Sequence, residues 1–280
     1  MSLAELKEAI GLLRRIPVLW VPGLVTGLLA AMLWLVFNSE GSFFASRLVL
    51  ICALIVVFFI AGSFAVIRNG NGSIRELFLG GIQYFFRMLL PMLVIAFAIL
   101  ILVTLMMIPL SFGGAMADPG FIGIFSICIL IPTAFLTFFA NTAAVFEDKR
   151  VFDSIKRSIE LVAARSFPVL NFFVISASLF FGVTFSLMIV WEAALFDKLE
   201  PLTRFNETQI AAFTPEQLTG MIGSEGTVIT AVCLFLGFLV LLPVLSTYKA
   251  CFFRSLTKGT VVISQQTAGE YDSKGRWYKY

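Results

Sequence analysis

Residues 89–110 read LLPMLVIAFAILILVTLMMIPL, an apolar run that no charged side chain interrupts. A helix rises about 1.5 Å per residue and the hydrocarbon core of a bilayer is about 30 Å thick, so this run is long enough to cross a membrane. Similar runs occupy residues 18–38, 48–67, 121–146, 169–191 and 227–248. With 59% hydrophobic residues and a mean hydropathy of +0.98, the chain is predicted to be an all-α integral membrane bundle of six transmembrane helices.

The basic residues are distributed unevenly between the two sides of this bundle. All of the 20 lysines and arginines except Arg47, Lys198 and Arg204 fall on the side that is predicted to hold both termini of the chain. By the positive-inside rule we expect that side to be cytoplasmic, in the cell membrane. We also expect it to attract the anionic headgroups of membrane lipids. Its basic residues are dispersed among acidic ones, which indicates no nucleic-acid site.

A similar segment precedes each odd-numbered span: helix-capping residues, an amphipathic helix, then an arginine shortly before a proline. At each arginine and proline we expect a sharp corner between the amphipathic helix and the span. We expect the amphipathic helices to lie on the cytoplasmic surface at about 3–15, 73–87 and 152–165. In the last of them Phe152, Ile155, Ile159 and Val162 share one face. Each helix with the hairpin that follows it forms one of three parallel units, which cover residues 2–68, 73–149 and 154–255.

The chain outside these hairpins is predicted to form a long extracytoplasmic loop and a tail. The transmembrane domain covers residues 1–255, and its loop at 192–226 contains a capping box from Thr214 to Gln217 that predicts a short helix. Residues 256–280 are expected to form a polar cytoplasmic tail.

Two spans carry small residues four positions apart, a spacing that lets membrane helices approach closely. The first ridge consists of Gly23, Gly27 and Ala31, and the second consists of Ser178, Gly182 and Ser186. Both are interpreted as helix-packing ridges within the chain, with a homodimer seam as the alternative.

Polar side chains follow the fourth span at helical spacing. Thr133, Thr137 and Asn141 form a stripe, and Asn171 lies at a similar depth on the fifth span. Because an intramembrane amide needs a partner, we expect spans four and five to pack through these residues. A path for a polar solute is the alternative. We also expect Pro132 to kink the fourth span.

Several chemical classes are excluded by what the sequence lacks. There is no histidine, so we expect no haem, zinc or copper site, and we predict no cofactor or metal. The 4 cysteines have no CxxC spacing and are interpreted as buried small hydrophobes. No charged residue lies at the middle of a predicted span, which argues against a proton relay or an ion-coupling carboxylate. We find no candidate catalytic residue and predict that the protein is not an enzyme.

The segment 144–161, AVFEDKRVFDSIKRSIEL, is followed by Arg165 and Pro168. It resembles a group of uncharacterised prokaryotic membrane proteins akin to the membrane domain attached to some glycerophosphodiester phosphodiesterases. The RIPVL sequence at 15–19 is similar to the opening of the first span in archaeal members. The resemblance implies the fold and a cell-membrane location. It transfers no catalytic residue, because the metal-binding barrel of those enzymes has no counterpart in this sequence.

Two classes of function remain. The favoured hypothesis is a non-catalytic membrane protein that serves as a component of a membrane complex or organises lipid, with a protein partner or a second copy of the chain. The alternative is a permease-like protein for an uncharged or amphipathic solute. A transporter usually needs fixed polar chemistry at the membrane midplane, and here the spans offer mainly hydroxyl groups.

Overall fold

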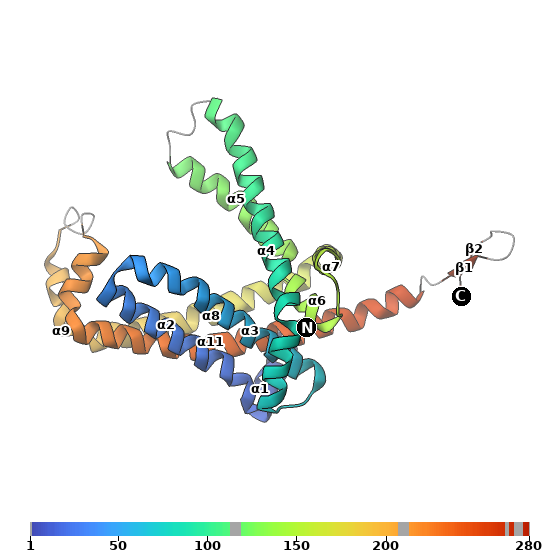
Figure 1. Ribbon diagram of the computed structural model, residues 1–280, viewed down its shortest axis with the longest axis horizontal. Helices are drawn as coiled ribbons and strands as arrows, with labels where there is room; N and C mark the ends of the chain where they lie inside the picture. Colours follow the sequence, from blue (N-terminus) through green and yellow to red (C-terminus); the bar gives the residue numbers. More distant parts are fainter. Residues whose placement is uncertain (1, 113–118, 207–212, 267–268, 272–276, 280) are drawn as a thin grey trace. The chain divides into compact units, whose positions relative to one another are not determined.

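The computed structural model describes residues 2–112, 119–206, 213–266, 269–271 and 277–279, which are almost entirely helical (Figure 1). In this part of the chain, 6 helices are long and apolar enough to cross a membrane. They cover Pro17–Ser39, Phe43–Asn69, Ile74–Ile108, Ser126–Phe146, Ser166–Ala194 and Gln217–Lys258. The six long apolar helices that the sequence predicted and the all-α class are therefore confirmed.

The first half of the chain contains α1 (Ser2–Arg15), η1 (Pro17–Trp20), α2 (Val21–Glu40), α3 (Ser42–Asn69), α4 (Ile74–Phe112) and α5 (Pro119–Thr137). The second half contains α6 (Ala140–Phe146), α7 (Val151–Ala164), α8 (Ser166–Ala194), α9 (Phe196–Leu199), η3 (Glu200–Arg204) and α11 (Pro215–Gln266). Two short antiparallel strands, β1 (Gly269–Tyr271) and β2 (Trp277–Lys279), follow. Helix α11 thus continues well into the segment that was expected to be a polar tail.

The chain forms two compact units. Unit 1 comprises Met1–Ala9, Gln83–Phe172 and Tyr248–Tyr280, and unit 2 comprises Ile10–Ile82 and Phe173–Thr247. Four helices, α1, α4, α8 and α11, contribute residues to both units.

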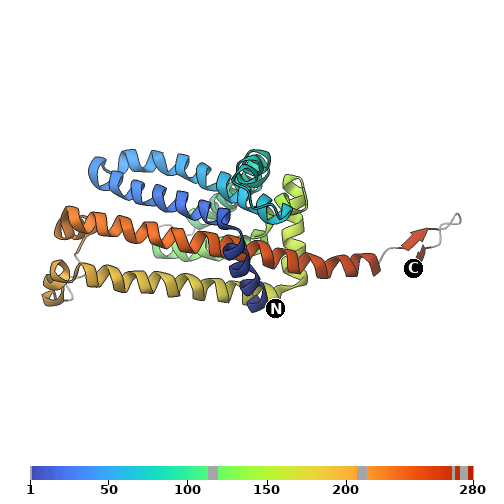
Figure 2. The same ribbon diagram turned by 90° about the horizontal axis from the view of Figure 1, so that it is seen from below.

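In unit 2, helices α2, α3, α8 and α11 run side by side (Figures 1 and 2). Gly23 and Gly27 of α2 lie against α11: a Cβ atom at Gly23 would lie 2.6 Å from the Leu239 carbonyl oxygen. At Gly27 the same atom would lie 2.6 Å from the Phe235 carbonyl oxygen. Trp34 extends the seam by donating a hydrogen bond from Nε1 to the Thr227 carbonyl, at 3.1 Å. The first small-residue ridge thus allows close helix packing inside the chain, with Ala31 half-buried beside it.

The second ridge, on α8, is open. Ser178, Gly182 and Ser186 are exposed, and a Cβ atom at Gly182 would meet no other atom within 4 Å. Both serine hydroxyls donate to carbonyl groups of α8 itself, those of Val174 and Gly182. Within unit 2 no helix packs on this ridge.

The predicted corner between residues 87 and 91 is absent. Helix α4 is a single helix of 39 residues, so the expected surface helix at 73–87 and the span that follows are continuous. Its start does have the expected serine cap, since the backbone N–H of Glu76 donates to Ser73 Oγ at 3.1 Å. Continuing through Pro91 loses one helical hydrogen bond, whereas a corner inside lipid would leave several backbone groups without a partner.

In unit 1, α7 packs against α5 and α6. Ser154, Ser158 and Leu161 are buried. Of the predicted apolar face, Phe152 is 74% exposed and Ile159 39% exposed, whereas Val162 is buried. The small serine side chains let α7 approach the neighbouring backbone, while Phe152 and Ile159 remain on the outside.

The core of unit 1 is aromatic. Phe139, Phe172, Tyr248, Phe252 and Phe253 are almost fully buried, and the ring of Phe172 lies 4.6 Å from that of Tyr248 and 4.7 Å from that of Phe252. Helix α11 is therefore enclosed by protein just beyond residue 248, where the sequence predicted the end of the sixth span.

The two ridges predict opposite responses to the same substitution. Gly27→Ala places a methyl group against the Phe235 carbonyl and should destabilise the protein by about 1–3 kcal/mol. Gly182→Ala meets nothing within 4 Å and should leave stability unchanged or raise it by up to about 1 kcal/mol. Unfolding of both variants in detergent measures the difference, and equal stability of the two would contradict the packing described here.

Candidate functional site

The fourth span is broken inside unit 1. Helix α5 runs through Pro132 and ends at Thr137, and α6 begins at Ala140. Phe138 and Phe139 lie between them in a turn. The sequence predicted a kink at Pro132, whereas the helix is interrupted at residues 138–139.

Ser158 of α7 satisfies the backbone at this break. Its hydroxyl donates to the Leu136 carbonyl at 2.8 Å and accepts the backbone N–H of Phe139 at 3.0 Å. The Ser158 side chain is fully buried. A hydroxyl both donates and accepts, so one side chain pairs two groups that the interrupted helix would leave without partners in an apolar environment.

Lys249 of α11 lies beside the same break. Its Nζ donates to Asn141 Oδ1 at 2.8 Å and lies 4.0 Å from the centroid of the Phe138 ring. Among the ion pairs found in the described residues, none includes Lys249. The ammonium group is therefore held by an amide oxygen and the face of an aromatic ring, a favourable cation–π arrangement.

The helix that carries this lysine is longer than the sequence indicated. Lys249 was assigned to the segment after the sixth span, and in the structure α11 continues through it to Gln266. The apolar run Ala250, Cys251, Phe252 and Phe253, all buried, follows the lysine directly and could have shown that the helix continues.

The sequence-predicted polar residues do not all meet. Asn141 contacts Lys249 and not Asn171, which is exposed. Its neighbour Phe172 occupies the core, and successive residues of a helix point about 100° apart, so the amide of Asn171 is turned away. Thr133 and Thr137 are half-buried and donate to carbonyl groups of their own helix, at 2.8 and 2.7 Å.

Charged residues cluster where α6 meets α7. Arg157 Nε donates to both carboxylate oxygens of Glu147, at 3.2 and 3.1 Å, and both side chains are largely buried. Asp148 forms a second pair, with Arg87 of α4 at 2.5 Å. A hollow of about 310 Å³ adjoins this pair, lined by Phe86, Arg87, Leu90, Asp148, Lys149, Arg150 and Val151.

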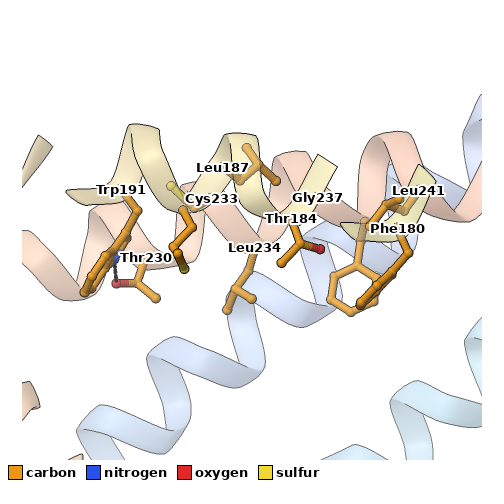
Figure 3. A pocket seen from close by; sticks show the side chains of 11 residues that line it. Phe180, Thr184, Leu187, Trp191, Thr230, Cys233, Leu234, Gly237 and Leu241 are labelled. Atoms are coloured by element: carbon orange, nitrogen blue, oxygen red, sulfur yellow. Dashed lines mark hydrogen bonds between the residues drawn. The ribbon is translucent and has the colours of Figure 1, made fainter. Parts of the chain in front are cut away.

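Unit 2 contains an apolar groove of about 400 Å³ between α8 and α11 (Figure 3). Its lining includes the small residues Thr184, Cys233 and Gly237. At one end Trp191 Nε1 donates to Thr230 Oγ1 at 2.8 Å. The groove lies in two candidate spans and has no acid or base in its lining, so it suits hydrocarbon and offers no catalytic chemistry.

Comparison with known proteins adds no family. No family model matches the chain, and neither a curated protein nor a solved structure is similar to it. The described residues also contain no group of 3 or more histidine, cysteine, aspartate or glutamate side chains able to hold a metal ion.

The two hydrogen bonds of Ser158 at the break predict a loss of stability for Ser158→Ala. Removing the hydroxyl leaves the Phe139 N–H and the Leu136 carbonyl unpaired and should destabilise the protein by about 1–3 kcal/mol. The control is Ser46→Ala, an exposed residue whose hydroxyl donates to the Phe43 carbonyl of its own helix and whose removal should cost less than about 0.5 kcal/mol. Equal unfolding free energies of the two variants in detergent would refute the role of Ser158.

Proposed function

We propose that this protein is a non-catalytic component of a membrane assembly, which binds a further membrane helix on the open ridge of α8. The further helix belongs to a second copy of the chain or to a partner protein. The observation that supports the proposal is the exposure of Ser178, Gly182 and Ser186 inside a candidate span.

The small-residue ridge on α2 shows how such a ridge packs within this protein, and the ridge on α8 can be compared with it. On α2, glycines at this spacing receive α11 with backbone atoms in close approach. Lipid supplies no hydrophobic drive to helix association, so such close approach is a main source of attraction between membrane helices. The α8 ridge has the same spacing and has its hydroxyls already bonded internally, yet no helix of unit 2 occupies it.

The position of the ridge on α8 leaves it accessible. Thr184, Leu187 and Trp191 face the groove shared with α11. From the helical repeat, Ser178, Gly182 and Ser186 lie about half a turn away, on the opposite side of α8. A further helix can therefore pack there without displacing α11.

A permease-like function is the second candidate, and the pair of Lys249 and Asn141 favours it. Broken helices with polar groups form the substrate sites of many transporters, and an ionisable residue inside a span is often functional. The threonines of the stripe argue against this function, because their hydroxyls are occupied by their own helix.

The assembly is tested by Gly182→Leu, with Gly123→Leu as the matched control. Gly123 is equally open, but it has proline and isoleucine four residues away at Pro119 and Ile127 and so belongs to no ridge. Two differently tagged copies are expressed together and purified in mild detergent, and the recovered proteins are quantified by mass spectrometry. We expect at least a 10-fold loss of the second copy or of a stoichiometric partner in Gly182→Leu and no loss in Gly123→Leu.

Two results would contradict the assembly. One is a wild-type chain that purifies alone. The other is an association that Gly182→Leu leaves intact. Solute flux in liposomes that is abolished by Lys249→Met would instead establish the permease.

A further inference from the structure

The hollow at the α6–α7 turn lies entirely within unit 1, between this turn and α4. We propose that it binds the phosphate of an anionic lipid headgroup. This site is separate from the proposed assembly, because none of its lining residues belongs to α8.

Positive charge dominates the lining. Arg87, Lys149 and Arg150 supply three cations, and Asp148 is the single carboxylate. Asp148 is already paired with Arg87 at 2.5 Å. Lys149 and Arg150 are exposed, and neither takes part in the ion pairs found among the described residues. Two cationic side chains thus line one hollow with their charge unmatched, which favours an anionic ligand.

The backbone at the hollow adds further donors. Asp148 has a φ of 52°, a left-handed conformation that non-glycine residues seldom adopt and that occurs in turns which point N–H groups toward anions. Helix α7 then begins at Val151, and its N-cap residue Arg150 makes no side-chain capping hydrogen bond. The first N–H groups of α7 and its positive dipole end therefore lie beside the cations and reinforce them.

The apolar part of the lining indicates a lipid as the source of the phosphate. Phe86 is 65% exposed and Leu90 43% exposed, and both lie within the candidate span Ile74–Ile108. Arg87 stands between them in sequence, with its side chain 49% exposed. Exposed apolar side chains directly beside cations match the boundary where a lipid headgroup meets its acyl chains.

Asp148 limits the affinity of the site. Its carboxylate occupies Arg87, the residue whose planar guanidinium is best suited to a bidentate contact with phosphate. Because the pair is about half exposed, at 49% and 43%, solvent screens it and its exchange for a phosphate contact is not prevented. Removal of the carboxylate should therefore strengthen lipid binding, whereas removal of the cations should weaken it.

The test titrates the purified full-length protein with short-chain phosphatidylglycerol and measures the apparent Kd by native mass spectrometry. The double variant Lys149→Gln/Arg150→Gln should weaken binding by about 10-fold or more, since charge-assisted contacts to the phosphate are lost. The control Lys156→Gln/Lys258→Gln removes the same charge from exposed positions outside the hollow and should change the Kd by less than about 2-fold. Asp148→Asn should tighten binding by about 3-fold or more, because it removes the repulsive charge and asparagine tolerates a positive φ.

Two further ligands distinguish the phosphate of a lipid headgroup from free inorganic phosphate. We expect zwitterionic phosphatidylcholine to bind at least about 10-fold more weakly, and about 10 mM inorganic phosphate to leave phosphatidylglycerol bound. Displacement by inorganic phosphate would overturn the assignment to a lipid. Equal losses in the two double variants would show a diffuse basic surface and would overturn the site itself. Thermal unfolding of each variant shows that a loss of binding is not a loss of fold.

Discussion

Because the bilayer core holds no water, every backbone N–H and carbonyl group there must be paired within the protein. In unit 1 this constraint applies to the break in the fourth candidate span. The fourth span stops being helical at Phe138 and Phe139, and Ser158 pairs with the backbone on both sides of that turn. This contact requires the serine face of α7 to point inward. The exposure of Phe152 and Ile159 follows, since they lie on another face of the same helix.

The same break determines where the polar groups of unit 1 lie. Asn141 lies in the first turn of α6, where its side chain accepts from Lys249 and from the backbone N–H of Thr142. The aromatic core holds α11 beside it, so the ammonium group lies over the Phe138 ring. At the other end of α6, Glu147 and Asp148 anchor Arg157 and Arg87. The short helix α6 thus connects the polar contact of Asn141 at its start with the basic hollow beyond its end.

Length and hydropathy predicted the six spans because both are sums over about twenty residues and are insensitive to single positions. Contacts between distant residues could not be predicted in this way. Asn141 and Lys249 lie 108 positions apart, and the sequence offered Asn171 as a partner at similar depth. The buried serines of α7 could not be predicted from hydrophobicity, because close approach to a broken backbone favours a small polar side chain. The corner expected in α4 was wrong because Pro91 can begin a helix or continue one.

Polar contacts from other helices hold the broken fourth span, and a double-mutant cycle between Asn141 and Lys249 measures one of these contacts. Asn141→Leu, Lys249→Met and the double variant are unfolded in detergent and compared with the wild-type protein. The contact of 2.8 Å predicts a stabilising coupling free energy of about 1–3 kcal/mol. Additive effects, with a coupling below about 0.3 kcal/mol, would contradict the account and show that the break is held without the lysine.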